Sequence, residues 1–273
     1  MMEITILMDN EKNDLVYRSE HGLSMLIEWN GTTVLFDTGK SDAFMQNAKL
    51  LGKDLTKVDY VVLSHGHYDH TGGLEAFLIF NKKAKIILKK EALDERWSVS
   101  QGYNRKIGFP LRKRFEQLNE RYMFVDETQE IVPGLIVFTD IAKQAGHTFT
   151  DSYLFVQQNH TLVPDTFKDE LFMAAVHNDK LTVFTGCAHN GVENMIRTAI
   201  EYTGIKKVEF VVGGTHLNRA SEQQVKRTIM ELGKFDIEKA AFNHCSGLQN
   251  IPRMAASLRG DIEYGYAGTR YVY

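Results

Sequence analysis

Four side chains that could bind metal ions lie close together in residues 64–73 (SHGHYDHTGG): His65, His67, Asp69 and His70. Imidazole nitrogens and carboxylate oxygens are the usual protein ligands of zinc and similar first-row metals, and a catalytic site keeps one position open for water. Without a cation, side chains of this kind would repel or compete with one another. The stretch therefore predicts a metal site, and a loop with four ligands can hold two ions.

The flanking patterns place this stretch between a strand and a helix. Residues 58–63 (VDYVVL) form a β-branched apolar run of buried-strand length, and residues 74–80 are apolar and compatible with a helix. Gly66, Gly72 and Gly73 suit a tight loop, because glycine adopts positive φ at little steric cost. The alternative, a polar surface turn, does not explain why so many ligand-type side chains are concentrated here.

The pattern His-x-His-x-Asp-His after an apolar strand resembles the signature of the metallo-β-lactamase superfamily. In that family the first two histidines bind one metal ion, while the aspartate and the last histidine bind a second. The resemblance implies that His65 and His67 serve the first ion and that Asp69 and His70 serve the second. It also implies an α/β fold, a four-layer αβ/βα sandwich, with the ligand-bearing loops gathered at one edge.

Upstream residues extend the resemblance. Asp37, in FDTG, either caps a following helix or orients the histidine loop, as a similar aspartate does in family members. Residues 20–28 (EHGLSMLIE) and the Asp9-Asn10 pair resemble one branch of the superfamily, which contains dihydropterin-ribofuranosylaminobenzene phosphate synthase and bacterial relatives. His21 either borders the site or belongs to an ordinary turn.

Three downstream histidines also follow strand patterns. His189, in TGCAHNG, is implied by the resemblance as the third ligand of the first ion, with helix capping or core packing as the alternative. His244, in HCSG, is the remaining ligand expected for the second ion. His216, in GGTHL, would bind substrate or stabilise a developing oxyanion, or else pack as a neutral core histidine.

Cys187 departs from the family pattern, because most members place a bridging aspartate after the Thr-Gly of this strand. Three interpretations are open: only water or hydroxide joins the ions, the second site is weak, or the thiolate coordinates a metal. Cys187 and Cys245 each lie within two residues of a histidine, which makes a disulfide framework a poor explanation. A reducing, cytoplasmic location fits this cysteine usage.

The elements that must position these residues follow from the remaining patterns. Strand patterns cover residues 3–8, 24–29, 32–36, 58–63, 85–89, 131–138, 181–184, 208–212 and 240–243, and helix patterns cover 74–80, 192–202 and 222–232. The runs on either side of Asn30-Gly31 predict a β-hairpin. Ser221 and Gln224 give a capping-box signal for the last of the helices.

Residues 91–124 break these patterns, because basic and aromatic residues are interleaved there. Arg112, Lys113 and Arg114 form the basic cluster. One interpretation is a solvated helix with an apolar underside. The other is a substrate lid, since guanidinium groups bind phosphate or carboxylate and aromatic faces stack on planar rings.

Length and net charge restrict the number of domains and the kinds of binding partner that we expect. We expect one domain over residues 1–273, with the lid as an insert. The 32 basic and 35 acidic residues give a net charge of -3, which offers no reason to expect nucleic-acid or nonspecific membrane binding. No apolar run approaches the length of a spanning helix, and the start, MMEITILMDN, lacks a signal-like pattern. The oligomeric state cannot be inferred from the sequence.

Together these features predict a metal-dependent hydrolase of an anionic, phosphorylated small molecule with a planar ring. Two divalent ions, zinc first and manganese, iron or magnesium as alternatives, would lower the pKa of a bound water. Metal-bound hydroxide is the expected nucleophile; Asp69 would orient it and His216 would assist the developing anion. Two alternatives stay open: a dihydropterin-type transferase that releases pyrophosphate, and a noncatalytic metal-binding or redox module that uses Cys187 and Cys245.

Overall fold

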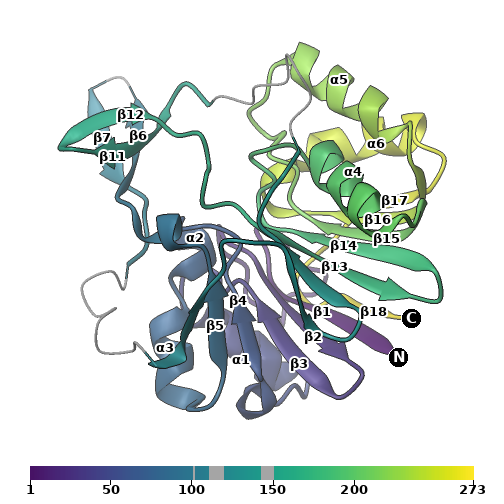
Figure 1. The fold of residues 1–273 in the computed structure, drawn as a ribbon, viewed down its shortest axis with the longest axis horizontal. Coiled ribbons are helices and arrows are strands. Elements are labelled where there is room, and N and C mark those ends of the chain that lie inside the picture. Colours follow the sequence, from purple (N-terminus) through teal and green to yellow (C-terminus); the bar gives the residue numbers. More distant parts are fainter. Residues whose placement is uncertain (101, 111–119, 143–150) are drawn as a thin grey trace. The chain divides into compact units, whose positions relative to one another are not determined.

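The computed structural model describes residues 1–100, 102–110, 120–142 and 151–273 (Figure 1). The chain folds into two compact units. Unit 1 contains residues 1–126, 150–170 and 266–273, and unit 2 contains residues 127–149 and 171–265. Each unit therefore joins segments that are distant in sequence. Whether the two act as the one domain expected from the sequence stays a prediction.

A seven-stranded sheet is the frame of unit 1, in the order β18-β1-β2-β3-β4-β5-β8. The strands are β1 (Met2–Met8), β2 (Ser24–Trp29), β3 (Thr32–Phe36), β4 (Tyr60–Val62), β5 (Lys85–Leu88), β8 (Tyr122–Phe124) and β18 (Arg270–Val272). Strands β3, β4, β5 and β8 pair in parallel, and the others pair antiparallel. The loops that leave the carboxyl ends of the parallel strands consequently start from one edge of the sheet.

The expected hairpin between β2 and β3 is confirmed. Asn30 has φ 46° and Gly31 has φ 87°. Two successive positive φ values match the tight turn whose twist suits antiparallel strands, and asparagine followed by glycine is the favoured sequence for it.

Helices α1 (Ala43–Leu50) and α3 (Leu74–Phe80) cover one face of this sheet (Figure 1). Phe44 and Phe77 are the large helix residues in the buried core there, and Leu35 and Ile86 are among the strand residues that they join. Three short helical segments complete the unit: η1 (Leu55–Lys57), α2 (Tyr68–Thr71) and η2 (Lys90–Leu93). The predicted helix over residues 74–80 is confirmed.

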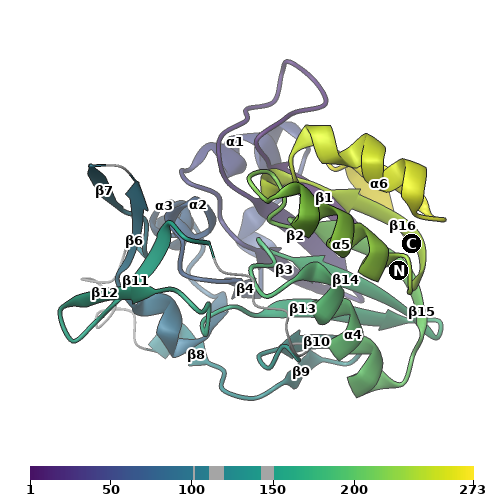
Figure 2. The ribbon, with the colours of Figure 1, turned by 90° about the horizontal axis from the view of Figure 1, so that it is seen from above.

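A second, four-stranded sheet of unit 1 has the order β12-β11-β6-β7 (Figure 2). It contains β6 (Arg96–Ser100), β7 (Tyr103–Lys106), β11 (Leu154–Gln158) and β12 (Thr161–Pro164). The helix considered for residues 91–124 is wrong over the described part of that stretch, which forms β6, β7, β8 and η2. The reason is nonlocal: β6 pairs with β11, which lies far along the chain. Arg112, Lys113 and Arg114 lie outside the described residues.

Unit 2 is built on another seven-stranded sheet, in the order β17-β16-β15-β14-β13-β10-β9. Its strands are β9 (Gln129–Val132), β10 (Leu135–Phe138), β13 (Phe172–His177), β14 (Lys180–Thr185), β15 (Lys207–Gly213), β16 (Asp236–Phe242) and β17 (Asp261–Tyr264). The four strands from β14 to β17 are parallel. Thr185, Gly213 and Phe242 are aligned in register, so three strands end at the same edge.

Helices α4 (Val192–Thr203), α5 (Glu222–Leu232) and α6 (Ile251–Ser257) accompany these parallel strands (Figure 2). The Ser221 hydroxyl accepts a hydrogen bond from the Gln224 N–H, as the capping signal predicted. Two 3-10 segments, η4 (His244–Ser246) and η5 (Leu248–Asn250), follow β16. Across the described ranges of both units, no helix has the length and apolar character needed to cross a membrane.

Candidate metal centre

Asp37 connects two histidines of the loop in unit 1. Its Oδ2 lies 2.6 Å from His70 Nδ1 and accepts the Ser64 hydroxyl at 2.7 Å, while Oδ1 accepts the Ser64 N–H at 2.8 Å. Ser64 Oγ lies 2.9 Å from His65 Nδ1. One buried carboxylate thus orients two imidazole rings through their Nδ1 atoms. The N-cap position of the next helix is Asp42, so Asp37 does not lie where it could cap that helix.

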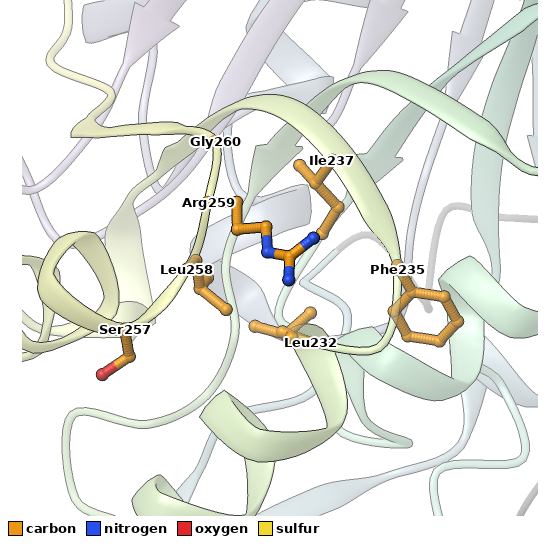
Figure 3. A pocket seen from close by; sticks show the side chains of 8 residues that line it. Leu232, Phe235, Ile237, Ser257, Leu258, Arg259 and Gly260 are labelled. Carbon is orange, nitrogen blue, oxygen red and sulfur yellow. The ribbon is translucent and has the colours of Figure 1, made fainter.

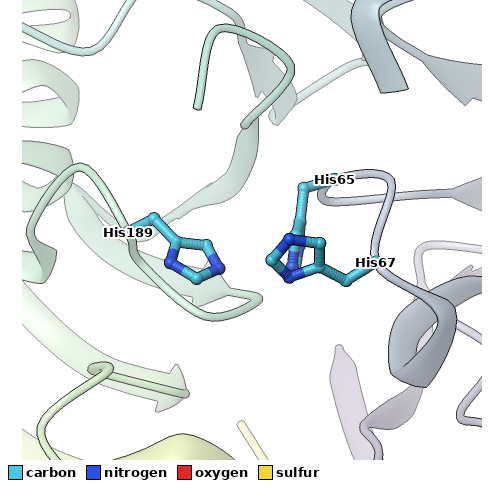
Figure 4. Close-up of side chains that lie close together, drawn as sticks. All are labelled: His65, His67 and His189. Carbon is cyan, nitrogen blue, oxygen red and sulfur yellow. The ribbon is translucent and has the colours of Figure 1, made fainter. Parts of the chain in front are cut away.

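The ligand-type side chains of unit 1 are close together. The ring centroid of His65 lies 4.5 Å from that of His67 and 4.3 Å from that of His70, and all three rings are buried. Figure 4 shows His65 and His67 leaving the same loop. His21 Nε2 lies 3.1 Å from Asp69 Oδ2, so this histidine borders the loop although its side chain is 54% exposed.

The backbone between His65 and His67 has little room to move. The Gly66 N–H donates to Asp169 Oδ2 at 2.7 Å. A Cβ at Gly66 would lie 2.1 Å from the Ala92 carbonyl oxygen, which explains why glycine is needed here. The loop therefore depends on glycine and on a buried carboxylate from a distant part of unit 1.

Arg96 holds Asp169 in place by an ion pair. Its Nη2 lies 2.8 Å from Asp169 Oδ1 and its Nε lies 2.9 Å from Asp165 Oδ2, with all three residues buried. Burial raises the pKa of Asp169 to about 6; the Arg96 charge opposes this rise and the Asp165 charge adds to it. Sequence reasoning missed this cluster, because 69 positions separate Arg96 from Asp165 and no local pattern joins them.

The four-stranded sheet also contacts the histidine loop. The Tyr68 N–H donates to the Ile107 carbonyl oxygen at 2.8 Å, and Ile107 packs with Leu154 and Phe167. The Arg105 guanidinium lies 5.2 Å from the centre of the Tyr68 ring. Part of the basic and aromatic stretch is therefore attached directly to the ligand loop.

Unit 2 brings together Cys187, His189 and His216. One ligand atom of each lies within 4.8 Å of those of the others, and the three residues come from the loops after β14 and β15. The rings of His189 and His216 have centroids 4.2 Å apart; Figure 4 shows His189 on its loop. His216 has φ 52° and Ala188 has φ 56°. Left-handed backbone at two non-glycine residues is costly and is typical of functional sites.

Cys187 also belongs to a second group, with His244 and Cys245. The His216 N–H donates to Cys245 Sγ at 3.2 Å, and this sulfur lies 3.5 Å from the Cys187 carbonyl oxygen. Burial raises the pKa of the Cys245 thiol, but contacts with Cys187 and His216 and the charge of His244 outweigh it and lower that pKa well below its ordinary value. Cys245 was not among the predicted site residues; its place beside His244 was the available signal.

The donor atoms fit a divalent first-row metal. Imidazole and carboxylate groups are gathered in unit 1, and imidazole and thiol groups in unit 2, at buried or half-buried positions whose orientation is held by hydrogen bonds or by constrained backbone. Candidate metal binding is thus supported by the chemistry of the donors.

A separate surface pocket of unit 2 contains none of these residues. Its cavity volume is about 70 Å³, and it is lined by residues at and after the ends of α5 and α6, including Phe235 and Arg259, together with Ile237 of β16 (Figure 3). The pocket offers one guanidinium group but no paired acid, base or nucleophile.

Comparison with known proteins identifies the family of this chain. The chain belongs to the metallo-β-lactamase superfamily, whose family model matches residues 18–164. Within it, the chain is similar to the 7,8-dihydropterin-6-methyl-4-(beta-D-ribofuranosyl)-aminobenzene-5'-phosphate synthase of Methanocaldococcus jannaschii. The two are 31% identical over 264 residues, which cover 92% of this chain and 89% of the relative. The superfamily and branch resemblance drawn from the sequence is confirmed.

Two solved structures define the fold. Tm1679, described as a metal-dependent hydrolase of the beta-lactamase superfamily, matches with a TM-score of 0.85 and 31% identity, covering 100% of this chain and 99% of that one. YhfI from Bacillus subtilis, a metallo-beta-lactamase fold protein, has a TM-score of 0.58 and 12% identity, covering 99% and 98%. The α/β metallo-β-lactamase fold expected from the sequence is confirmed.

Proposed function

We propose that this protein is a metal-dependent hydrolase of an anionic small molecule with a planar ring. The observation that carries the proposal is the hydrogen-bonded frame in which Asp37 orients His65 and His70. We assign His65, His67 and His189 to one divalent ion and Asp69, His70 and His244 to a second, with zinc as the expected metal. The family pattern supports this assignment.

When bound, two divalent ions lower the pKa of a water and stabilise charge on the reacting oxygens. The protein's own groups would hold and move protons around that reaction. Asp69 Oδ2, which lies 3.1 Å from His21 Nε2, is our candidate for orienting the attacking water. His216, fixed by its backbone contact with Cys245, is our candidate for assisting the developing anion.

The substrate class is inferred from the groups beside the histidine loop. Arg105 is exposed and lies over the Tyr68 ring, so a guanidinium and an aromatic face are presented together. Such a pair suits a phosphate or carboxylate carried by a flat ring. Arg112, Lys113 and Arg114 remain proposed contributors to the lid over residues 91–124. A cytoplasmic location remains part of the proposal.

A transferase is the second candidate, and the similarity to a synthase in Methanocaldococcus jannaschii favours it. The ligand set proposed above would serve either reaction, so the products must decide. A noncatalytic metal-binding or redox module is the third interpretation.

The test is turnover of the metal-loaded full chain on phosphoesters, lactones and a pterin diphosphate, in water enriched in ¹⁸O. Hydrolysis predicts a product that contains one solvent oxygen and needs no second substrate. A transferase would release product only when an aromatic acceptor is added. Absence of turnover on every substrate, with metal fully loaded, would count against the hydrolase.

A further inference from the structure

We propose that Cys187 binds metal through its thiolate, so that unit 2 supplies a nitrogen and sulfur ligand set. This inference deepens the proposed function and rests on it for the presence of a metal. The inference is independent of the reaction that the protein performs, because it predicts only a metal–sulfur bond.

The first argument is that Cys187 is common to two groups of potential ligands within unit 2. Its sulfur lies within 4.8 Å of ligand atoms of His189 and His216, and also within 4.8 Å of ligand atoms of His244 and Cys245. Around a tetrahedral zinc ion, with bonds of about 2.3 Å to sulfur and about 2.0–2.1 Å to nitrogen, ligand atoms lie roughly 3.5 Å apart. Separations within 4.8 Å are compatible with closure around one ion by side-chain rotation.

The second argument is the backbone that brings the groups together. Three parallel strands end in register, and Cys187, His216 and His244 lie two or three residues beyond those ends. His244 has φ 51° and His216 has φ 52°. Because such conformations are unfavourable for residues with a Cβ, the fold holds these side chains at fixed positions at a cost.

The third argument is the close approach at Gly214. A Cβ at this position would lie 2.6 Å from Cys245 Sγ and 3.3 Å from Cys187 Cα. Only glycine lets the chain pass between the two cysteines at this distance. The close approach brings the loop after β15 against both cysteines, and Cys187 is the residue that the two groups share.

The difference between the two cysteines provides a matched control. Both are buried thiols of the same unit, but Cys187 belongs to both groups of ligand-type residues in unit 2, whereas Cys245 belongs to one of them. We therefore assign metal binding to Cys187 and use Cys245 as the comparison. A thiolate ligand favours zinc or cobalt over magnesium or manganese, which prefer oxygen.

The experiment is ultraviolet and visible spectroscopy of the cobalt-loaded full chain. We expect a sulfur-to-cobalt charge-transfer band in the wild type, its loss in Cys187→Ser and its retention in Cys245→Ser. Cys187→Asp should keep cobalt bound without the band. A wild type that binds cobalt without the band, or a band that survives Cys187→Ser, would overturn the proposal.

A second measurement needs no variant. X-ray absorption of the zinc-loaded wild type should show a sulfur neighbour at about 2.3 Å in addition to nitrogen at about 2.0–2.1 Å. A shell of nitrogen and oxygen alone would overturn the thiolate ligand. A sulfur neighbour in a protein without hydrolytic activity would support the thiolate ligand and contradict the proposed hydrolase function. The failure of one proposal can therefore be distinguished from the failure of the other.

Discussion

Unit 1 and unit 2 present potential metal ligands in opposite ways. In unit 1, the four ligand-type residues come from one short stretch after β4: His65 and His67 lie in the loop, and Asp69 and His70 lie in α2, which follows it directly. In unit 2, the ligand-type residues come from three loops, each at the end of a different parallel strand. The first set is encoded in consecutive residues, and the second depends on how strands are ordered in a sheet.

The two sets are also held in place differently. Around the histidine loop, buried carboxylates accept hydrogen bonds: Asp37 from Ser64, and Asp169 from Gly66. Around the unit 2 group, left-handed backbone at His216 and His244 and the lack of a Cβ at Gly214 fix the positions. Replacing the buried acidic residues should therefore misplace the ligands of unit 1. Replacing Gly214 or the cysteines should misplace the ligands of unit 2.

The largest expected effect is loss of metal from the histidine loop. His65→Ala and His67→Ala each remove an imidazole and should empty the first ion's site while the protein stays folded. Elemental analysis of the dialysed protein, with circular dichroism as the control for folding, measures this. Full metal occupancy in either variant would show that the assignment is wrong.

Asp169→Ala should cause the next largest effect. It leaves the buried Arg96 guanidinium with Asp165 as its remaining carboxylate among the described contacts, and breaking a buried ion pair costs about 3–5 kcal/mol. Urea denaturation of the variant measures the loss. Asp261→Ala is the matched control, because the Asp261 side chain is 68% exposed and its removal should change stability by about 0.5 kcal/mol or less. Equal losses in the two variants would contradict the role of Asp169.

Asp37→Asn should weaken metal binding without abolishing it. The amide keeps the shape of the side chain but loses the charge that orients His70, and such changes typically cost 10–100-fold in affinity. Competition with a chromophoric chelator gives the dissociation constant. An unchanged constant would show that the hydrogen bond to His70 is not needed for metal binding.

The smallest expected effect concerns the proposed lid. Replacing Arg112, Lys113 and Arg114 with glutamine should weaken an anionic ligand by roughly 5–10-fold while leaving its uncharged analogue nearly unaffected, since screened surface charges contribute modestly. Calorimetric titration of both ligands makes the comparison. Equal losses for the two ligands would favour a packing role instead.

The features that could be predicted from the sequence are those whose determinants lie close together in the chain. The histidine loop, the Asn30-Gly31 hairpin and the helix that begins after Ser221 were predicted from short patterns, because their determinants lie within a few residues. Asp37 was also predicted, although only the structure shows that it contacts both Ser64 and His70.

The parts that escaped prediction depend on long-range contacts. Gly66 and Asp169, which accepts a hydrogen bond from its N–H, are 103 positions apart in the sequence. Strand β6 pairs with β11, and several other strands lie between them in the sequence. Cys245 was considered only together with Cys187, in the metal-binding or redox alternative, because its proximity to Cys187 arises only when β14, β15 and β16 align. Local periodicity carries no information about such pairings.

The most direct test of the central claim is the zinc content of the full chain after reconstitution of metal-free protein and gel filtration. The proposed ligand sets predict about two zinc ions per chain, and His67→Ala should remove at least one of them. A wild-type chain that retains no zinc, or a His67→Ala chain that retains as much as the wild type, would contradict the assignment of these residues as a metal centre.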